Sequence, residues 1–511
     1  MISNLFTRKK GKIADLKAQR TSYRDMFKAT SLFGGVQVFN ILIAVIRTKF
    51  VAVFLGTSGI GILSLLQSVL SLLENITQMG LSVSAVRDIS VASGTGDHHT
   101  VSRTITVFRH LIWFTGILGT LSMIVLSHWL SIWTFGNTDF TYVFVWLSGT
   151  LFLAAISSGQ ITLLHGLQKL REMAKATVWG SAMGLAISMP FYYWLGQRGI
   201  VPTLIISSVM GLMISWLFSR KIQFQKIKVS WREAFREGKD MARLGILMTM
   251  SSFTNMFASY MVNVFIARNG GLADVGLFQA GWNITNKYVG LVFTAMVTDY
   301  FPRLSKVHDD VKKIREVLNQ QAELALLILG PILIILLSTT PFVIHLLYTK
   351  QFLPVVSFIQ WVIFGLLFSV GSWSLGFIFM AKGDSKLYFQ KELFSSIVIV
   401  VSNILGYYLG GLEGLGISYT VGNTIIFFFV SWLCFYKYKI VLGFEFRKIL
   451  IIELVLCLIA FFIAYKFGFP YAYFSGGILL IIISGFSLFE LNKRMNIMET
   501  LVNRFLKKIK N

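Results

Sequence analysis

Apolar residues along the 511-residue chain gather in runs that are too long for the core of a soluble domain. A helix needs about 20 consecutive apolar residues to cross the hydrocarbon core of a bilayer. Short polar or basic stretches separate the runs, and each run therefore predicts one spanning helix. The predicted spans lie near residues 29–55, 59–86, 105–130, 141–166, 173–196, 200–219, 242–267, 275–301, 322–347, 354–380, 389–410, 413–436, 449–467 and 472–490.

An internal repeat relates the first pair of spans to the seventh and eighth. VAVFLGTSGIGILSLLQ at 51–67 resembles VNVFIARNGGLADVGLFQ at 262–279, and both read as an apolar helix, a short glycine-containing outer loop and a second apolar helix. Six helices separate the copies, so both have the same orientation, and a pseudo-two-fold axis would run along the membrane normal. The space between two such bundles is a usual place for a transported substrate.

We therefore predict an all-α polytopic membrane protein of about 14 transmembrane helices, with two six-helix bundles and two additional C-terminal helices. The predicted segments are a basic N-terminus (1–28), an N-terminal bundle (29–219), a basic linker (220–241), a C-terminal bundle (242–436), the additional helices (437–490) and an amphipathic basic tail (491–511).

Polar residues form stripes along four of the spans when successive residues are placed 100° apart. The stripes lie on corresponding helices of the two repeats, as expected if these helices face one aqueous cavity. The alternative is that the polar side chains only bond neighbouring helices together. The stripes are Gln37, Asn40, Ala44 and Arg47; Ser64, Gln67, Ser71, Glu74, Gln78 and Ser82; Ser252, Asn255, Ser259 and Asn263; and Gln279, Asn283, Asn286, Lys287, Gly290 and Thr294.

Charged residues inside the spans are costly unless they are paired or hydrated. Lys287 is the most central cation, whereas Arg47 either faces the cavity or snorkels to the interface. Glu74 either carries a coupling proton or balances one of these cations. Asp299 precedes Arg303 by one helical turn, which predicts a local ion pair. The candidate substrate-binding residues are Lys287, Arg47, Gln37, Asn40, Glu74, Gln78, Gln279, Asn283 and Asn286.

Composition and charge agree with a membrane location. Hydrophobic residues make up 55% of the chain and charged residues only 14%, which is too few for a soluble surface. Of the 47 Lys and Arg residues, 39 fall in segments on one side of the membrane and four in loops on the other. Because positive residues favour the cytoplasm, both termini are predicted to be cytoplasmic. The net charge of +24 therefore reflects topology, and we predict no nucleic-acid partner.

Two cytoplasmic segments have the pattern of helices that lie on a membrane surface. The first covers residues 231–243 and begins at a capping box of Ser230 and Glu233. The second is the C-terminal tail, where apolar and basic residues occupy opposite faces. Attachment to anionic membrane lipids is one interpretation, and binding of a partner protein is the other. Cys434 and Cys457 fall inside apolar runs, which predicts neither a disulfide nor a metal site.

The sequence RTKFVAVFLGTSGIGILSLLQS at 47–68, followed by MGLSVSAVRDIS at 79–90, carries a resemblance to a known family. With its fixed glycines and Arg87, the chain resembles the Wzx-type polysaccharide (O-antigen) flippases of the multidrug/oligosaccharidyl-lipid/polysaccharide exporter superfamily over residues 28–437. The resemblance implies alternating-access transport of an undecaprenyl-pyrophosphate-linked oligosaccharide, an O-antigen or capsule repeat unit, across the bacterial cytoplasmic membrane. It implies neither cofactor nor metal, and its possible partners are a polysaccharide polymerase and chain-length proteins.

The number of helices departs from the family pattern, and alternative functions stay open. Many Wzx-type proteins have twelve helices, and the surplus pair predicted here resembles that of the peptidoglycan lipid II flippases, where it helps to bind the lipid tail. A cation-coupled multidrug exporter of the same superfamily would favour acidic residues in the first span, which has none. A membrane enzyme would need a large outer loop, whereas the predicted outer loops have about ten residues or fewer. We therefore predict a transporter without enzymatic activity.

Overall fold

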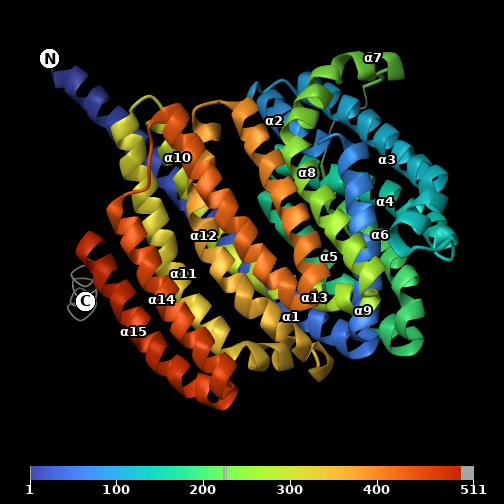
Figure 1. Cartoon of the computed structure of the whole chain (residues 1–511). Coiled ribbons are helices and arrows are strands. Elements are labelled where there is room, and N and C mark those ends of the chain that lie inside the picture. The colour runs from blue at the N-terminus through green and yellow to red at the C-terminus, as the bar shows by residue number, and fades with distance from the viewer. Residues whose placement is uncertain (1, 223–224, 226, 496–511) are drawn as a thin grey trace. The chain divides into compact units, whose positions relative to one another are not determined.

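The computed structural model describes residues 2–222, 225 and 227–495, and within this range every regular element is a helix (Figure 1). Side chains are described from residue 39 onward, apart from 247–248, 287–289, 291, 295, 298, 470 and 495. The first eight helices are α1 (Ile2–Gln78), α2 (Leu81–Gly94), α3 (His98–Phe135), α4 (Thr141–Gly166), α5 (Leu170–Leu195), α6 (Ile200–Ser219), α7 (Trp231–Glu237) and α8 (Lys239–Asn269). They are followed by α9 (Leu272–Trp282), α10 (Val289–Lys306), α11 (Val311–Leu347), α12 (Val356–Ala381), α13 (Ser385–Tyr438), α14 (Phe444–Phe467) and α15 (Phe469–Met495).

Nine segments in the described part of the chain are long and apolar enough to cross a membrane. Three of them contain an internal break, namely Phe39–Gln78, Leu170–Ser219 and Ser385–Tyr438. The prediction of an all-α polytopic membrane protein is confirmed, and the count of about 14 helices is compatible with these segments.

Two of the breaks lie at glycines whose backbone conformations other residues avoid. Gly56 divides α1 with φ 64° and ψ −169°, and Gly411 divides α13 with φ 57° and ψ −135°. The two halves of α13 form a hairpin, because the Ser418 hydroxyl donates to Asn403 Oδ1 over 3.1 Å. Both breaks fall where the sequence predicts short loops.

The structure differs from the predicted spans at two places. The predicted helix 59–86 is interrupted at Met79 and Gly80, which have φ values of 50° and 62°. Gly80 lies against the backbone of Gly245. A Cβ atom at either position would overlap the backbone of the opposite segment. The first predicted span begins earlier than expected, because α1 begins at Ile2 and the basic segment 1–28 is continuous with it. Most of the predicted tail helix lies outside the described residues.

The predicted capping box at the start of α7 is confirmed. The Ser230 backbone N–H donates to Glu233 over 3.0 Å, and the Glu233 N–H donates to the Ser230 hydroxyl over 3.3 Å. The helix is shorter than predicted and ends at Glu237, whose carboxylate pairs with Arg103 over 2.6 Å. The hydrogen bond from Arg103 lowers the pKa of the Glu237 carboxyl.

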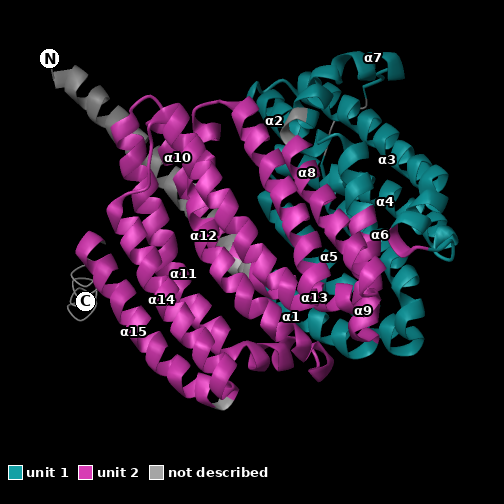
Figure 2. Ribbon diagram, in the orientation of Figure 1, with its two compact units in different colours: residues 1–54, 70–133, 137–249 teal, residues 55–69, 134–136, 250–511 magenta. Residues whose placement is uncertain are grey.

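The chain forms two compact units (Figure 2). Unit 1 comprises Met1–Phe54, Leu70–Trp133 and Asn137–Thr249, and unit 2 comprises Leu55–Val69, Thr134–Gly136 and Met250–Asn511. The predicted division into two bundles at the linker 220–241 stays a prediction.

A reciprocal glycine contact lies at the centre of the internal repeat, within unit 2. A Cβ atom on Gly61 would overlap the carbonyl oxygen of Leu272, and one on Gly276 would overlap that of Thr57. Gly56 and Gly271 both have positive φ and extended ψ, and both lie five residues before these glycines. The contact is therefore symmetric, as an isologous interface between two copies of one motif requires.

The additional C-terminal helices α14 and α15 lie beside α11 (Figure 1). Arg494 of α15 joins the three helices at one end, where its guanidinium donates to Glu323 over 2.9 Å and lies 3.6 Å from Glu445. The same guanidinium also pairs with Glu490. The buried Glu453 of α14 packs against Gly330 of α11, so the helix pair belongs to the body of unit 2.

We expect Gly61→Ala and Gly276→Ala each to lower the thermal unfolding temperature and the yield of folded protein. The added methyl group forces the two backbones apart and removes their close packing. Gly149→Ala on α4 is the matched control, because nothing lies within 4 Å of its Cβ position and alanine favours a helix. Unfolding of purified variants in detergent measures the effect. Equal unfolding temperatures for Gly61→Ala and Gly149→Ala would contradict the close backbone contact.

Candidate functional site

In unit 1, the predicted polar stripe continues from α1 across the break into α2. Gln78 is buried, and its Nε2 donates to Glu74 Oε1 over 2.8 Å. One turn further on, the Ser82 hydroxyl lies 3.1 Å from the Ser158 hydroxyl of α4. Glu74 and Gln78 are thus brought together as the helical arithmetic predicts.

A cavity of about 650 Å³ lies beside Ser82, between α2, α4 and α6. We call it the hydroxyl pocket, because hydroxyl groups and one imidazole make up its polar lining. Hydroxyl groups both donate and accept hydrogen bonds, so the pocket suits a ligand rich in hydroxyls. The polar lining residues are Ser82, Ser157, Ser158, Thr162, His165 and Ser208.

Sequence reasoning missed most of this pocket. Ser158, Thr162 and His165 follow one another at spacings of four and three residues, which places them on one face of a helix. That spacing was available in the sequence. The prediction considered stripes only on the first two spans and their repeat partners, whereas the pocket is completed by the fourth and sixth spans.

Three other candidates also belong to unit 1, on α1. Arg47 is half-buried and interacts with the hydroxyl of the buried Tyr192 of α5. Asn40 Oδ1 is buried without a hydrogen-bond partner among the described residues. Gln37 lies on the same helix, but its side chain is outside the described part. An unsatisfied buried amide oxygen is unusual and marks Asn40 as a polar group that a ligand or water can satisfy.

In unit 2, Gln279 takes part in a hydrogen-bonded chain across three helical segments. Gln279 Nε2 donates to Asn263 Oδ1 over 2.8 Å, and Asn263 Nδ2 donates to the Ser68 hydroxyl over 3.3 Å. The Ser68 hydroxyl in turn donates to the Ser64 carbonyl over 2.8 Å. These contacts join α8 and α9 to the second half of α1, so they support the packing interpretation for these residues.

The remaining candidates lie on a π-helical segment, Asn283–Tyr288, between α9 and α10. Asn283 is exposed, and Asn286 is half-buried with its Nδ2 3.4 Å from the Thr285 hydroxyl. The side chain of Lys287 lies outside the described part. A rotation of 100° per residue does not hold in a π-helix, so the predicted stripe 279–294 is not one continuous face. Such segments occur frequently at functional sites.

An ion pair inside a predicted span was also missed. Lys391 and Glu392 of α13 are largely buried, and their charged atoms lie 2.6 Å apart. Glu392 also accepts from Asn255 Nδ2 of α8 over 3.3 Å. Both residues lie at the beginning of the predicted span 389–410, and the sequence analysis did not single them out. The predicted pair of Asp299 and Arg303 is confirmed at 3.1 Å.

A chain of apolar helices, an internal repeat about a glycine contact and polar residues inside the spans define a multi-pass membrane transporter. Solved structures share this fold. One is an inward-facing multidrug resistance MATE family transporter of the MOP superfamily, with a TM-score of 0.66, 16% identity and coverage of 81% of this chain and 96% of that chain. Another is the lipid II flippase MurJ in an inward closed conformation, with a TM-score of 0.66, 16% identity and coverage of 90% and 99%.

The sequence comparisons narrow this class. Residues 20–357 match the family described as polysaccharide biosynthesis protein, and the chain belongs to that family. The chain is also 19% identical over 359 residues to the lipid III flippases of Escherichia coli K12 and Shigella flexneri, covering 69% of this chain and 84% of each relative. These relatives are transporters.

We expect Glu392→Gln to destabilise the protein by about 3 kcal/mol, because it leaves Lys391 largely buried without its counter-charge. The double variant Lys391→Met with Glu392→Gln should recover most of that loss. Thermal unfolding in detergent measures both. The exposed pair offers the control, since Asp299→Asn should change stability by less than about 1 kcal/mol. Equal effects of Glu392→Gln and Asp299→Asn would show that burial does not strengthen the inner pair.

Proposed function

We propose that the protein moves an undecaprenyl-pyrophosphate-linked oligosaccharide from the inner to the outer leaflet of the bacterial cytoplasmic membrane. Both termini are on the cytoplasmic side in this proposal, as the asymmetry of the basic residues favours. Membership of the polysaccharide biosynthesis protein family supports a flippase of a lipid-linked substrate. The lipid III flippase relatives support an oligosaccharide head, because the matched region covers most of their length.

The hydroxyl pocket is the observation on which the proposal chiefly rests. A sugar exposes hydroxyl groups that must keep hydrogen bonds when the head leaves water. Ser82, Ser158 and Thr162 offer donors and acceptors within one cavity of about 650 Å³. A cationic drug would instead need carboxylates, and the polar lining of this pocket contains none. We therefore assign the pocket to part of the oligosaccharide.

The pyrophosphate needs a compensating cation in a medium of low dielectric constant. Lys287 is the most central cation in the sequence and is proposed as its main partner. Arg47, beside Tyr192 in unit 1, is proposed as a second, because its guanidinium matches phosphate oxygens. The π-helical segment carries Asn283, Asn286 and Lys287 together, and the two amides are proposed to hydrogen-bond the head.

Two alternative functions, a lipid II flippase and a multidrug exporter, are supported by similarity of fold alone. The lipid II flippase and the multidrug transporter are similar to this chain in fold at 16% identity, which supports the architecture without indicating a substrate. The sequence match to the lipid III flippases favours an oligosaccharide of the polysaccharide pathway over peptidoglycan. Transport needs no covalent chemistry, so no residue is proposed as catalytic.

We expect Gly211→Phe to reduce export of the lipid-linked oligosaccharide at least tenfold. Gly211 lines the hydroxyl pocket, and the nearest atom to its Cβ position is the Ser157 hydroxyl at 3.9 Å, so a benzyl group fills the cavity without a backbone clash. Surface polysaccharide in a strain lacking its own flippase measures export, and immunoblotting measures the protein in the membrane.

Gly149→Phe on α4 is the control, because its Cβ position faces open space and its exposed site lies outside the pocket. It should leave export near that of the unmodified protein. Normal export by Gly211→Phe at normal protein levels would remove the hydroxyl pocket from the transport path and leave the flippase assignment to the family relationship alone.

We expect Lys287→Ala nearly to abolish surface polysaccharide, Lys287→Arg to retain part of it and Arg47→Ala to have a smaller effect. The alanine variant removes the cation that the pyrophosphate needs at mid-depth, whereas arginine keeps the charge but changes its reach. The same export measurement applies, normalised to the protein in the membrane. Full export by Lys287→Ala at normal levels is incompatible with this role.

A further inference from the structure

Two cavities unused by the proposed function lie next to each other in unit 1. The first, the apolar groove, has a volume of about 610 Å³ and is lined by mostly apolar and aromatic side chains of α3, α4 and α6, together with Arg109 and Gln160. The second, the basic pocket, has a volume of about 740 Å³ and contains His98, Lys169 and Lys221. One is suited to hydrocarbon and the other to an anion.

The same three elements connect the cavities end to end. Along α3, Ile105 lines the basic pocket and Phe108 the groove. At the end of α4, Leu167 lines the basic pocket and Leu163 the groove. At the end of α6, Lys221 lines the basic pocket and Trp216 the groove. Steps of three to five residues correspond to about 5 to 8 Å along a helix, so an amphiphile can occupy both cavities at once.

Backbone geometry fixes the lysines of the basic pocket. Gln168, which precedes Lys169, has φ 54°, a left-handed backbone conformation that residues other than glycine rarely adopt. The turn is held by the Lys169 N–H, which donates to the Leu164 carbonyl over 2.8 Å. On the other side, the Gln225 N–H donates to the Ser102 hydroxyl over 3.0 Å and fixes Gln225 in the lining of the pocket.

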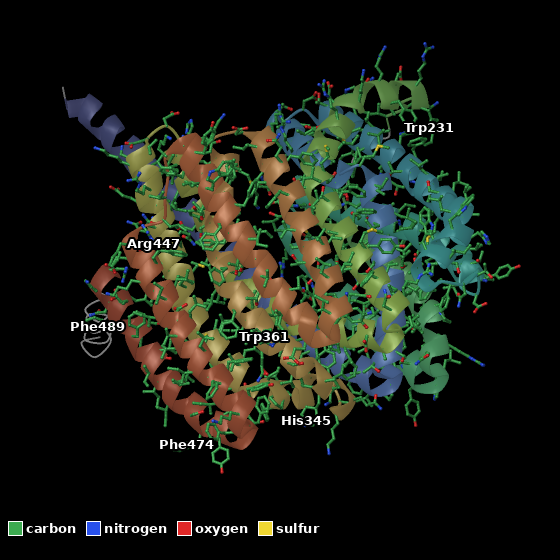
Figure 3. All side chains as sticks on the ribbon, viewed as in Figure 1. Trp231, His345, Trp361, Arg447, Phe474 and Phe489 are labelled. Atoms are coloured by element: carbon green, nitrogen blue, oxygen red, sulfur yellow. The ribbon has the colours of Figure 1, made fainter. Side chains whose placement is uncertain are left out.

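The aromatic residues of α7 indicate the depth of these cavities in the membrane. Trp231, seen on α7 in Figure 3, packs edge-on against His110 with ring centroids 4.7 Å apart, and Phe235 packs against Phe114 at 4.8 Å. Both α7 rings remain exposed, by 50% and 41%. Exposed aromatics on an amphipathic helix lie at the level of the lipid headgroups. The groove of α3 begins at this level, and the basic pocket lies on its polar side.

We infer that the basic pocket and the apolar groove together bind a phospholipid with two phosphate groups, cardiolipin, at the surface of unit 1. The basic pocket contains two lysines, and Arg109 lines the adjacent apolar groove. These three cations match a headgroup with two phosphates better than a headgroup with one. Basic pockets between transmembrane helices on the cytoplasmic side suit such headgroups. Trp113, Met213 and Trp216 are about half exposed along the groove, and an acyl chain would cover them. The inference does not depend on the transported substrate.

The full-length protein, purified in mild detergent, tests the site by native mass spectrometry of bound cardiolipin. We expect the double variant Lys169→Gln with Lys221→Gln to weaken binding about thirtyfold, since each basic residue near an anionic surface contributes about a fivefold factor and the two factors multiply. Met213→Trp, which fills the groove from α6, should weaken it without a change of charge. The matched control is Arg171→Gln with Lys175→Gln on α5, which removes two charges outside both cavities.

Four outcomes would overturn the inference. The first three are unchanged cardiolipin binding in the lysine variant, equal loss in the control, and phosphatidylglycerol binding as tightly as cardiolipin at an equal phosphate concentration. Preferential binding of undecaprenyl pyrophosphate over cardiolipin would also overturn it and would mark the cavities as a substrate site. Loss confined to the lysine and Met213→Trp variants, with thermal unfolding temperatures near that of the unmodified protein, supports it.

Discussion

The contact between Gly61 and Gly276 is the constraint on which the rest of unit 2 depends. Apolar side chains gain nothing by leaving lipid for another helix, so helices in a membrane associate where small residues let their backbones approach. The two glycines place each backbone against a carbonyl of the other helix. This approach sets the register in which Ser68, Asn263 and Gln279 meet. The polar chain across α1, α8 and α9 is therefore a consequence of the glycine contact.

The cost of polar groups in hydrocarbon explains why two carboxylates inside the predicted spans have local hydrogen-bond or ion-pair partners. Glu74 bonds Gln78 within unit 1, and Glu392 bonds Lys391 and Asn255 within unit 2, so each carboxylate has a local partner before any ligand binds. Polar side chains that bond each other in this way avoid the free-energy penalty of unsatisfied polar groups in hydrocarbon. Asn40 is different, because its buried oxygen has no partner in the described part of the chain.

Much of the fold could be predicted because the membrane imposes it. An apolar run in lipid must form a helix, because its backbone groups can bond only within the segment. The breaks at Gly56 and Gly411 fall at predicted loops. The interruption at Gly80 was missed because it depends on Gly245, a contact between residues far apart in the sequence. The hydroxyl pocket was missed for a related reason, since its walls on α4 and α6 come together only in the fold. The π-helical segment carries no sequence signal that separates it from an α-helix.

The glycine contacts also make the two repeats unequal. Residues 55–69 of α1 belong to unit 2, where Gly61 meets Gly276, whereas residues 70–78 belong to unit 1, where Gly80 follows them and meets Gly245. The separation that relates Gly61 to Gly276 relates Gly80 to Ala295 and Gly245 to Thr30. The first contact thus pairs two glycines that are equivalent in the repeat, whereas the counterpart of the second would pair an alanine with a threonine. The close glycine contact therefore has its counterpart within the sequence repeat at Gly61 and Gly276, but not at Gly80 and Gly245.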